Sequence, residues 1–194
     1  TFGANSFSDP DAGQTLSYAA SNLPPGIAFD GPTRTFSGTP TNVGLYAVTV
    51  TAMDDGAPPM NTNTTFLFVV NKAPLTLQAE NQSRGYGAAA PVFTMNYSGF
   101  VLGETSAALA FTPIADCLAD TNSAVGNYPI TVTGGADAHY EPVLVNGTLT
   151  VTNVPLVVQA HDLARPVGQT NPPLTGAIVG LVNGDNITPM FETT

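Results

Sequence analysis

The sequence predicts an all-β protein built from tandem β-sandwich modules, and three observations lead to this prediction. Short runs in which apolar and β-branched residues alternate with polar residues recur along the chain. Turn-forming residues, 19 Gly and 17 Pro, are spread between these runs instead of being gathered in one region. A segment that begins at Ala73 starts again at Val154. Many short strands, frequent turns and an internal repeat are together typical of an array of small β-sandwiches.

Strands are expected wherever apolar and polar residues alternate. In residues 46–52 every second residue is apolar, and Thr49 and Thr51 lie between them. This is the pattern of a strand with one face buried and the other exposed. The same pattern, or an enrichment in β-branched residues, predicts strands over residues 15–20, 46–53, 65–70, 75–79, 128–132 and 143–151. The only helix expected is one short turn within residues 104–110.

Turns are expected where Pro, Gly and Asn stand together between the strands. Pro fixes φ at a turn corner, and Gly takes positive φ without strain. These signals occur at Pro24-Pro25-Gly26, Gly31-Pro32, Asn146-Gly147 and Asn183-Gly184. Because Asn-Gly favours a two-residue hairpin turn, we predict that Asn146-Gly147 is a hairpin turn.

The internal repeat determines the predicted domain organisation. When Ala73 is aligned with Val154, the two copies continue in register without a gap. Pro74, Gly87, Pro91, Gly99 and Gly103 then meet Pro155, Gly168, Pro172, Gly180 and Gly184. Since Gly and Pro specify turns, the same turns are expected in both copies. The length of this repeat is typical of a small immunoglobulin-like sandwich and exceeds that of most solenoid repeats.

The modules predicted from this repeat are residues 1–71, residues 72–153, and residues 154–194 as the N-terminal half of a second copy. Each boundary runs from a strand through a short hinge into Pro, without a flexible linker. Such rigid junctions predict tandem immunoglobulin-like β-sandwich modules in an extended array.

Charge excludes several classes of function. The chain has 14 acidic and four basic residues, a net charge of −10. It therefore repels nucleic acid and anionic lipid, and no run approaches the about 20 apolar residues that span a bilayer. We expect no nucleic-acid partner and no membrane insertion. Hard cations such as calcium are natural partners of excess carboxylates, although the acidity alternatively serves only to keep the surface soluble.

The sequence also predicts no catalytic residues. Cys117 is the only cysteine, so the chain has no intrachain disulfide. A nucleophilic thiolate needs a histidine nearby, yet His139 and His161 lie in quite different local contexts. Neither histidine is accompanied by a serine motif or by metal-ligand spacing. We therefore expect a packed thiol and a protein that is not an enzyme.

The motifs of the first module occur in a characteristic order. They are Phe7-Ser8-Asp9-Pro10-Asp11-Ala12-Gly13, Leu16-Ser17-Tyr18, Leu23-Pro24-Pro25-Gly26-Ile27, Thr35-Phe36-Ser37-Gly38-Thr39-Pro40, and residues 46–54. In these motifs residues 1–71 resemble the dystroglycan-type cadherin-like, or He-PIG-like immunoglobulin, repeats of bacterial surface proteins. The opening strand of that family would precede Thr1.

The second module has a different set of motifs. They are Ala73-Pro74-Leu75-Thr76, Asn81-Gln82-Ser83-Arg84, Tyr86-Gly87-Ala88, Tyr97-Ser98-Gly99-Phe100, residues 126–132 and residues 146–151. The module resembles the MBG domain of the YGX type, and residues 154–194 resemble it more weakly, with Val167 in place of the tyrosine. The two resemblances imply a secreted, extracellular, multi-domain bacterial surface protein whose modules serve as stalks or adhesive repeats. Neither family brings catalytic residues.

Asp9, Asp11 and Asp54 are the candidate metal ligands, with Asp55 nearby. In the cadherin-like layout, the resemblance implies that the Asp-x-Asp turn and the Asp that ends the long strand meet at one pole and bind calcium. Calcium takes six to eight oxygen ligands, and clustered carboxylates supply them. Alternatively, Asp-Pro-Asp is only a turn in which Asp caps its own backbone. No other cofactor is predicted.

For two further sets of residues we prefer an interpretation without a binding function. Arg84 and Arg165 are equivalent in the repeat, and either contact a carboxylate or saccharide or bridge loops of their own module. Bridging is the preferred interpretation. Glycosylation sequons occur at Asn63, Asn81, Asn96, Asn146 and Asn186, and a chain this rich in Asn and Thr contains them by chance.

Two hypotheses for function remain. The first is a non-catalytic structural or stalk module of a secreted bacterial surface or filament-forming protein. The second is an adhesin module that binds carbohydrate or a protein on another cell. This binding would depend on calcium if Asp9, Asp11 and Asp54 bind that ion. The chain lacks Trp, and most Tyr and Phe fall in core patterns, which favours the structural role. Incomplete first and last modules leave unpaired sheet edges, which a strand of another copy would complete in a head-to-tail assembly.

Overall fold

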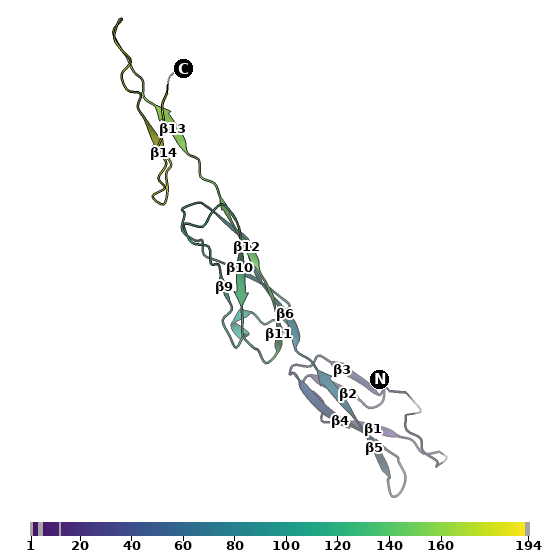
Figure 1. Ribbon diagram of the computed structural model, residues 1–194. Helices are drawn as coiled ribbons and strands as arrows, with labels where there is room; N and C mark the ends of the chain where they lie inside the picture. Colours follow the sequence, from purple (N-terminus) through teal and green to yellow (C-terminus); the bar gives the residue numbers. More distant parts are fainter. Residues whose placement is uncertain (1, 4–5, 12, 193–194) are drawn as a thin grey trace. The chain divides into compact units, whose positions relative to one another are not determined.

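The computed structural model describes residues 2–3, 6–11 and 13–192 (Figure 1). Thr1, Ala12 and Thr194, which belong to the predicted motifs and module limits, lie outside these residues. Within the described chain there are fourteen β-strands, one 3-10 helix and no α-helix. The 3-10 helix, η1 (Ser106–Ala108), falls in the segment for which one helical turn was predicted. The all-β fold class is confirmed.

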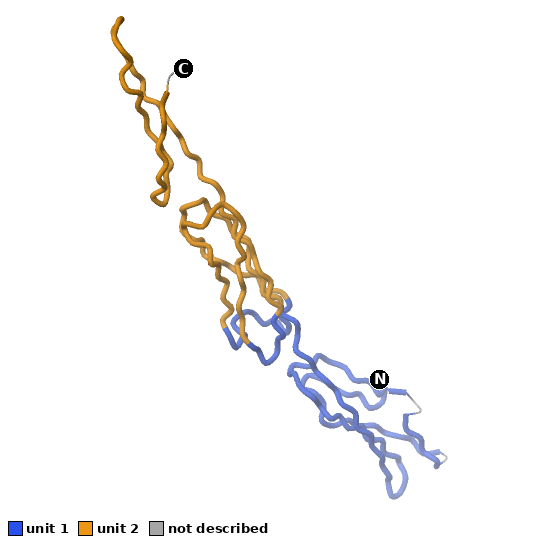
Figure 2. Tube along the Cα trace, in the orientation of Figure 1, with its two compact units in different colours: residues 1–75, 99–111, 136–142 blue, residues 76–98, 112–135, 143–194 orange. Residues whose placement is uncertain are grey.

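The described chain divides into two compact units (Figure 2). One comprises residues 1–75, 99–111 and 136–142, and the other comprises residues 76–98, 112–135 and 143–194. The predicted module limits at 71–72 and 153–154 do not coincide with this division and stay predictions.

The first residues of the chain form a three-stranded sheet and a hairpin. The sheet has the order β1-β4-β5, with β1 (Ser17–Ser21), β4 (Gly44–Met53) and β5 (Asn61–Val70) all antiparallel. The hairpin pairs β2 (Ile27–Asp30) with β3 (Thr35–Gly38). The alternation predicted for β4 is confirmed, because Val48, Val50 and Ala52 are buried while Thr49 and Thr51 are only half-buried. Each fully buried Val contributes roughly 1.5–3 kcal/mol to folding.

Several strand limits differ from the prediction, and the strand predicted over residues 143–151 is divided between β11 and β12. Two of the differences have identifiable reasons. Strand β1 begins at Ser17 instead of residue 15, because the Thr15 N–H donates to Asp55 Oδ1 at 2.9 Å. Strand β5 begins at Asn61, ahead of the predicted start at residue 65. Residues 61–64 are all Asn and Thr and show no apolar alternation, yet they pair with β4 down to Met53.

Residues 73–152 form two further sheets. One has the order β7-β12-β10-β9, with β7 (Gln82–Gly85), β12 (Gly147–Thr152), β10 (Gly126–Thr133) and β9 (Ile114–Asp116). The other has the order β11-β6-β8, with β11 (Tyr140–Val145), β6 (Ala73–Ala79) and β8 (Met95–Ser98). Both sheets contribute fully buried side chains, among them Leu77, Ile130 and Leu149. This is the arrangement of a β-sandwich core.

The prediction that Asn146-Gly147 forms a hairpin turn is wrong. Strands β11 and β12 flank these residues but belong to different sheets. A type I′ hairpin turn needs positive φ at both central residues, and neither Asn146 nor Gly147 has it. Instead, the Asn146 side-chain Oδ1 accepts the Val132 N–H at 3.0 Å. Gly147 is buried, and a Cβ there would lie 2.7 Å from the carbonyl oxygen of Ala79. The glycine permits a close crossing from one sheet to the other.

The internal repeat is confirmed by backbone geometry. Strand β13 (Val157–Ala160) pairs with β14 (Gly176–Val179) in a hairpin visible in Figure 1. Val157 pairs with Val179, and the equivalent residues of the first copy, Thr76 and Ser98, are likewise paired between β6 and β8. The Glu80 N–H donates to Thr94 O and the His161 N–H donates to Thr175 O, both at 2.9 Å.

The same turns recur in the two copies. Leu102 and Gly103 have φ of 57° and 74°, and Asn183 and Gly184 have φ of 53° and 71°. In each case the turn is closed at 3.0 Å, by Glu104 N–H to Val101 O and by Asp185 N–H to Val182 O. The Asn183-Gly184 turn predicted from the sequence is therefore confirmed.

The two copies differ in burial. Leu75 and Leu77 in β6 are 0 % exposed, whereas their equivalents Leu156 and Val158 are 41 % and 54 % exposed. Residues 154–192 contain the counterparts of β6 and β8, and the positions equivalent to β10, β11 and β12 lie beyond residue 194. The described part of the second copy is thus a hairpin with an open apolar face.

Candidate functional site

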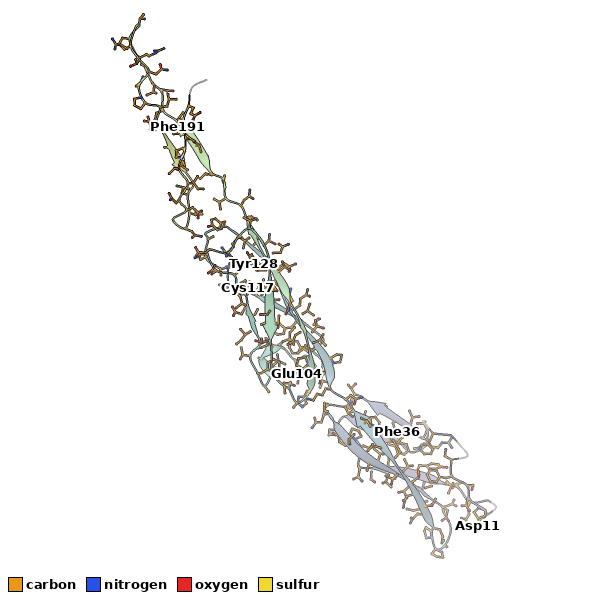
Figure 3. All side chains as sticks on the ribbon, in the orientation of Figure 1. Asp11, Phe36, Glu104, Cys117, Tyr128 and Phe191 are labelled. Atoms are coloured by element: carbon orange, nitrogen blue, oxygen red, sulfur yellow. The ribbon has the colours of Figure 1, made fainter. Side chains whose placement is uncertain are left out.

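The Asp-Pro-Asp turn is held by its own side chains. Asp9 Oδ1 accepts the Asp11 N–H at 2.9 Å, which is an Asx turn. Gln14 Nε2 donates to Asp11 Oδ2 at 3.5 Å. Asp11, labelled in Figure 3, is exposed, whereas Asp9 is half-buried. This geometry is that of the alternative interpretation, in which Asp caps its own backbone.

Asp54 and Asp55 organise the loop that joins β4 to β5. Asp54 Oδ1 accepts N–H groups from Gly56 at 3.1 Å and Met60 at 2.8 Å. Asp55 accepts the Thr15 N–H at 2.9 Å and the Thr15 hydroxyl at 2.7 Å. The Thr15 N–H and then its hydroxyl hold the pKa of Asp55 below its ordinary value.

Only two of the three predicted calcium ligands line the same hollow. Asp9 and Asp54 both border a hollow of about 150 Å³, and Asp11 does not. No group of three or more His, Cys, Asp or Glu side chains suited to a metal ion occurs among residues 2–3, 6–11 and 13–192. The residues present do not by themselves supply the six or more oxygens that calcium takes, and Asp54 Oδ1 is already engaged. Calcium binding stays a prediction.

Arg84 bridges loops, as the preferred interpretation predicted. Arg84 is 7 % exposed, and its guanidinium donates to three backbone carbonyls, those of Gly85 at 3.4 Å, Ala88 at 2.8 Å and Asp120. Arg165 repeats one of these bonds, because its Nη1 donates to Gln169 O at 2.7 Å, again four residues later. The described contacts of both arginines are with backbone of the same chain, so they stabilise loops.

Asp137 is a buried carboxylate that the sequence analysis did not find. Its Oδ1 accepts N–H groups from His139 at 2.8 Å and Tyr140 at 3.0 Å, and its Oδ2 accepts the Ala110 N–H at 3.0 Å. The Ala110 N–H, followed by that of His139, lowers the pKa of Asp137 against the opposing effect of burial. The Asp-x-His-Tyr spacing is typical of an aspartate that caps its own turn, and this spacing could have indicated the bonds to His139 and Tyr140. The bond to Ala110 could not be predicted, because Ala110 is 27 residues away and nothing in its local sequence indicates the contact.

A second polar cluster surrounds Tyr140. This side chain is 1 % exposed, and its ring lies edge-on to Phe100 with centroids 5.4 Å apart. Its hydroxyl donates to Glu104 Oε2 at 2.5 Å and accepts the Val101 N–H at 3.2 Å. Burial and the bond to Glu104 raise the pKa of Tyr140 above its ordinary value. The arrangement ties the turn of residues 101–104 to β11.

The cysteine, His161 and the sequon asparagines were the remaining candidates. The contacts described for them are structural and do not form a catalytic arrangement. Cys117, labelled in Figure 3, is a free, half-buried thiol. His161 Nδ1 lies 3.3 Å from the Thr175 hydroxyl across the β13–β14 hairpin. Of the sequon asparagines, Asn81 Oδ1 accepts the Thr148 N–H at 2.8 Å, and Asn96 Nδ2 donates to Glu80 Oε1 at 2.8 Å.

Comparison with protein families gives a match over two segments of the chain. Residues 1–72 match the family described as "Putative Ig domain", and residues 75–150 match the MBG domain of the YGX type. The predicted resemblance to an immunoglobulin-like domain followed by an MBG domain is therefore confirmed. None of the curated proteins compared with the chain matches it.

The two families define the class of protein at a coarse level. Immunoglobulin-like and MBG domains are typical modules of extracellular surface proteins, and they are typically non-catalytic. Among the residues that the structure describes, no helix is long and apolar enough to cross a membrane.

Proposed function

We propose that the chain is a non-catalytic structural spacer of an extracellular bacterial surface protein. The observation that carries the proposal is the repeated backbone of residues 73–104 and 154–185. Strand register, turn closure and the positions with positive φ are the same in both copies. Repeated units that share a backbone conformation are suited to a protein whose length increases with each added module.

The residues shared by the two copies support this role. Gly99 and Gly180 both take positive φ, and a Cβ at either would lie within 2.5 Å of a carbonyl oxygen. Several polar side chains, by contrast, are lost in the second copy: Gln82, Ser83 and Tyr86 correspond to Leu163, Ala164 and Val167. A binding site repeated for its ligand would keep its polar side chains. The shared Arg84 and Arg165 bind backbone.

Association with another copy of the chain is part of the proposal. The open apolar face of the second hairpin includes Leu156 and Val158, which are 41 % and 54 % exposed, with Ile178 opposite Val158 on the neighbouring strand. In the first copy, the equivalent face of β6 is buried in the core of its own sandwich. Light scattering over a concentration series should detect self-association that Val158→Asn weakens, whereas a monomer at every concentration would contradict it.

The spacer role is tested by measuring height on a cell. The chain is displayed between a membrane anchor and a terminal fluorophore, with one, two or three copies of residues 73–153. A spacer predicts that axial localisation of the fluorophore rises by the same increment for each added copy. An unchanged height would contradict the role.

A second candidate function, adhesion to a saccharide or a cell-surface protein, has separate support in the immunoglobulin-like domain. A polar hollow there contains hydrogen-bonding atoms without partners.

A further inference from the structure

A hollow of about 730 Å³ lies in the immunoglobulin-like domain between β1 and the turn that joins β2 to β3. Its volume is within the range of about 300–1,000 Å³ usual for small-molecule sites. Phe7, Asp9, Gln14, Tyr18 and Arg34 are among the residues that line it. All of these residues belong to one compact unit.

Gly31 builds one wall of the hollow. A Cβ at this position would lie 2.3 Å from the carbonyl oxygen of Tyr18, so only glycine lets the turn lie against β1. The Arg34 N–H closes the turn by donating to Gly31 O at 3.1 Å, and Arg34 itself has φ of 57°. This backbone holds the guanidinium of Arg34 over the Tyr18 ring, 5.7 Å from its centroid. The position of the cation is therefore fixed by backbone geometry.

The lining residues carry three buried atoms that lack partners. Asp9 Oδ2, Gln14 Oε1 and Arg34 Nε are hidden from solvent and have no hydrogen-bond partner among the described residues. Elsewhere in the described chain, only Arg84 Nε is in the same state. An unpaired buried polar group costs about 1–3 kcal/mol, and native proteins rarely leave one. Three such atoms belong to residues that line one hollow, where rotation of these side chains would bring the atoms to a ligand that completes their hydrogen bonds.

The chemistry of these atoms selects the ligand. Asp9 and Gln14 offer acceptors, Arg34 offers a donor, and a hydroxyl group satisfies either kind because it both donates and accepts. Arg34 disfavours a metal cation in the hollow, and Asp9 disfavours an anion. Phe7 and Tyr18 add apolar ring surface, against which the C–H faces of a sugar pack. We propose that this hollow binds a neutral saccharide, a function that does not depend on the spacer role.

A zwitterionic amino acid is the main competitor, since its ammonium and carboxylate groups would pair with the same three atoms. It would fill only a small part of the hollow, whereas two or more linked sugar rings use the volume available. The test therefore includes both kinds of ligand.

The experiment is a titration of the full isotope-labelled chain followed by amide chemical shifts. The probes are cello-, xylo-, malto- and chitohexaose, and glycine as the zwitterion. We expect at least one hexasaccharide to shift amides of residues 7–18 and 31–34. Arg34→Gly should weaken that binding at least tenfold. Gln14→Ala, which leaves the turn of residues 31–34 unaltered, should weaken it to the same extent.

Asn22→Gly is the matched control. Asn22 is an exposed residue of the same domain with φ of 59°, so both glycine variants relieve the same backbone strain. Only Arg34→Gly removes a group from the hollow, and Asn22→Gly should bind as the unaltered chain does. The proposal is overturned if no hexasaccharide shifts these amides at 10-fold molar excess and above, if Arg34→Gly binds unchanged, or if only glycine binds.

Discussion

The hydroxyl of Tyr140 donates a 2.5 Å hydrogen bond to Glu104, a residue 36 positions earlier in the chain. The same hydroxyl accepts the Val101 N–H, so one buried side chain fixes both ends of the turn at residues 101–104. This turn recurs at residues 182–185. In the first copy it is anchored by a side chain that lies on a later strand of the sandwich.

Tyr140→Phe should destabilise the MBG domain by about 1–3 kcal/mol. The phenyl ring keeps the contact with Phe100, but the Glu104 carboxylate and the Val101 N–H lose their partner. Urea unfolding followed by tyrosine fluorescence measures the change. Tyr128→Phe is the control, since the one partner described for the Tyr128 hydroxyl is Ala124 O, in an exposed loop. Equal losses in the two variants would refute a special role for Tyr140.

Asp137 should make stability fall in acid. Its folded pKa is depressed, chiefly by the Ala110 N–H, so its contribution is fully present above the ordinary pKa of about 3.9. The contribution is lost as pH falls through the folded pKa. Asp137→Asn should be less stable at pH 7 by about 1–3 kcal/mol. Its stability should also change less than that of the unaltered chain between pH 5 and pH 2.

The measurement is the urea midpoint at several pH values. Asp116→Asn is the control, because Asp116 is exposed and the one N–H described as donating to its carboxylate is that of Cys117. An Asp137→Asn variant with the same acid sensitivity as the unaltered chain would contradict the account.

Gly99→Ala should be far more damaging than Gly103→Ala. Both residues have positive φ, 112° and 74°, so both substitutions strain the backbone. A Cβ at Gly99 would also lie 2.4 Å from Pro74 O, whereas nothing lies within 4 Å at Gly103. We expect a loss of about 1 kcal/mol for Gly103→Ala and more than twice that for Gly99→Ala. Thermal unfolding of the two variants measures the difference, and similar midpoints would show that the close approach is not required.

Calcium binding is decided by calorimetry on the full chain. If Asp-Pro-Asp is only a turn that caps its own backbone, neither heat nor a change in melting temperature is expected up to millimolar Ca²⁺. Submillimolar binding that Asp54→Asn abolishes would instead support the calcium site predicted from the sequence.

Features of the fold that depend on the local pattern of apolar, Gly and Pro residues could be predicted from the sequence. Strand β4 was recognisable because Val48, Val50 and Ala52 alternate with Thr, and the recurring turns because Gly and Pro keep the register of the repeat. The polar start of β5 was missed, since its strand character comes only from pairing with β4.

Contacts between distant residues were beyond reach from a single sequence. The Asn-Gly pair at 146–147 has the local signature of a hairpin, but tertiary packing turns it into a crossing between sheets. The bonds from Asp137 to Ala110 and from Tyr140 to Glu104 join segments 27 and 36 residues apart. The hollow beside Tyr18 likewise depends on a close approach of Gly31 that no local pattern encodes.

Small-angle X-ray scattering of the full chain tests the spacer role most directly. A single compact domain of 194 residues would have a radius of gyration of about 16 Å. Modules that build length predict a value well above this, and one that rises with each added copy of residues 73–153. A radius of gyration equal to that of a single compact domain, and growing with added copies only as a sphere does, would contradict the proposed function.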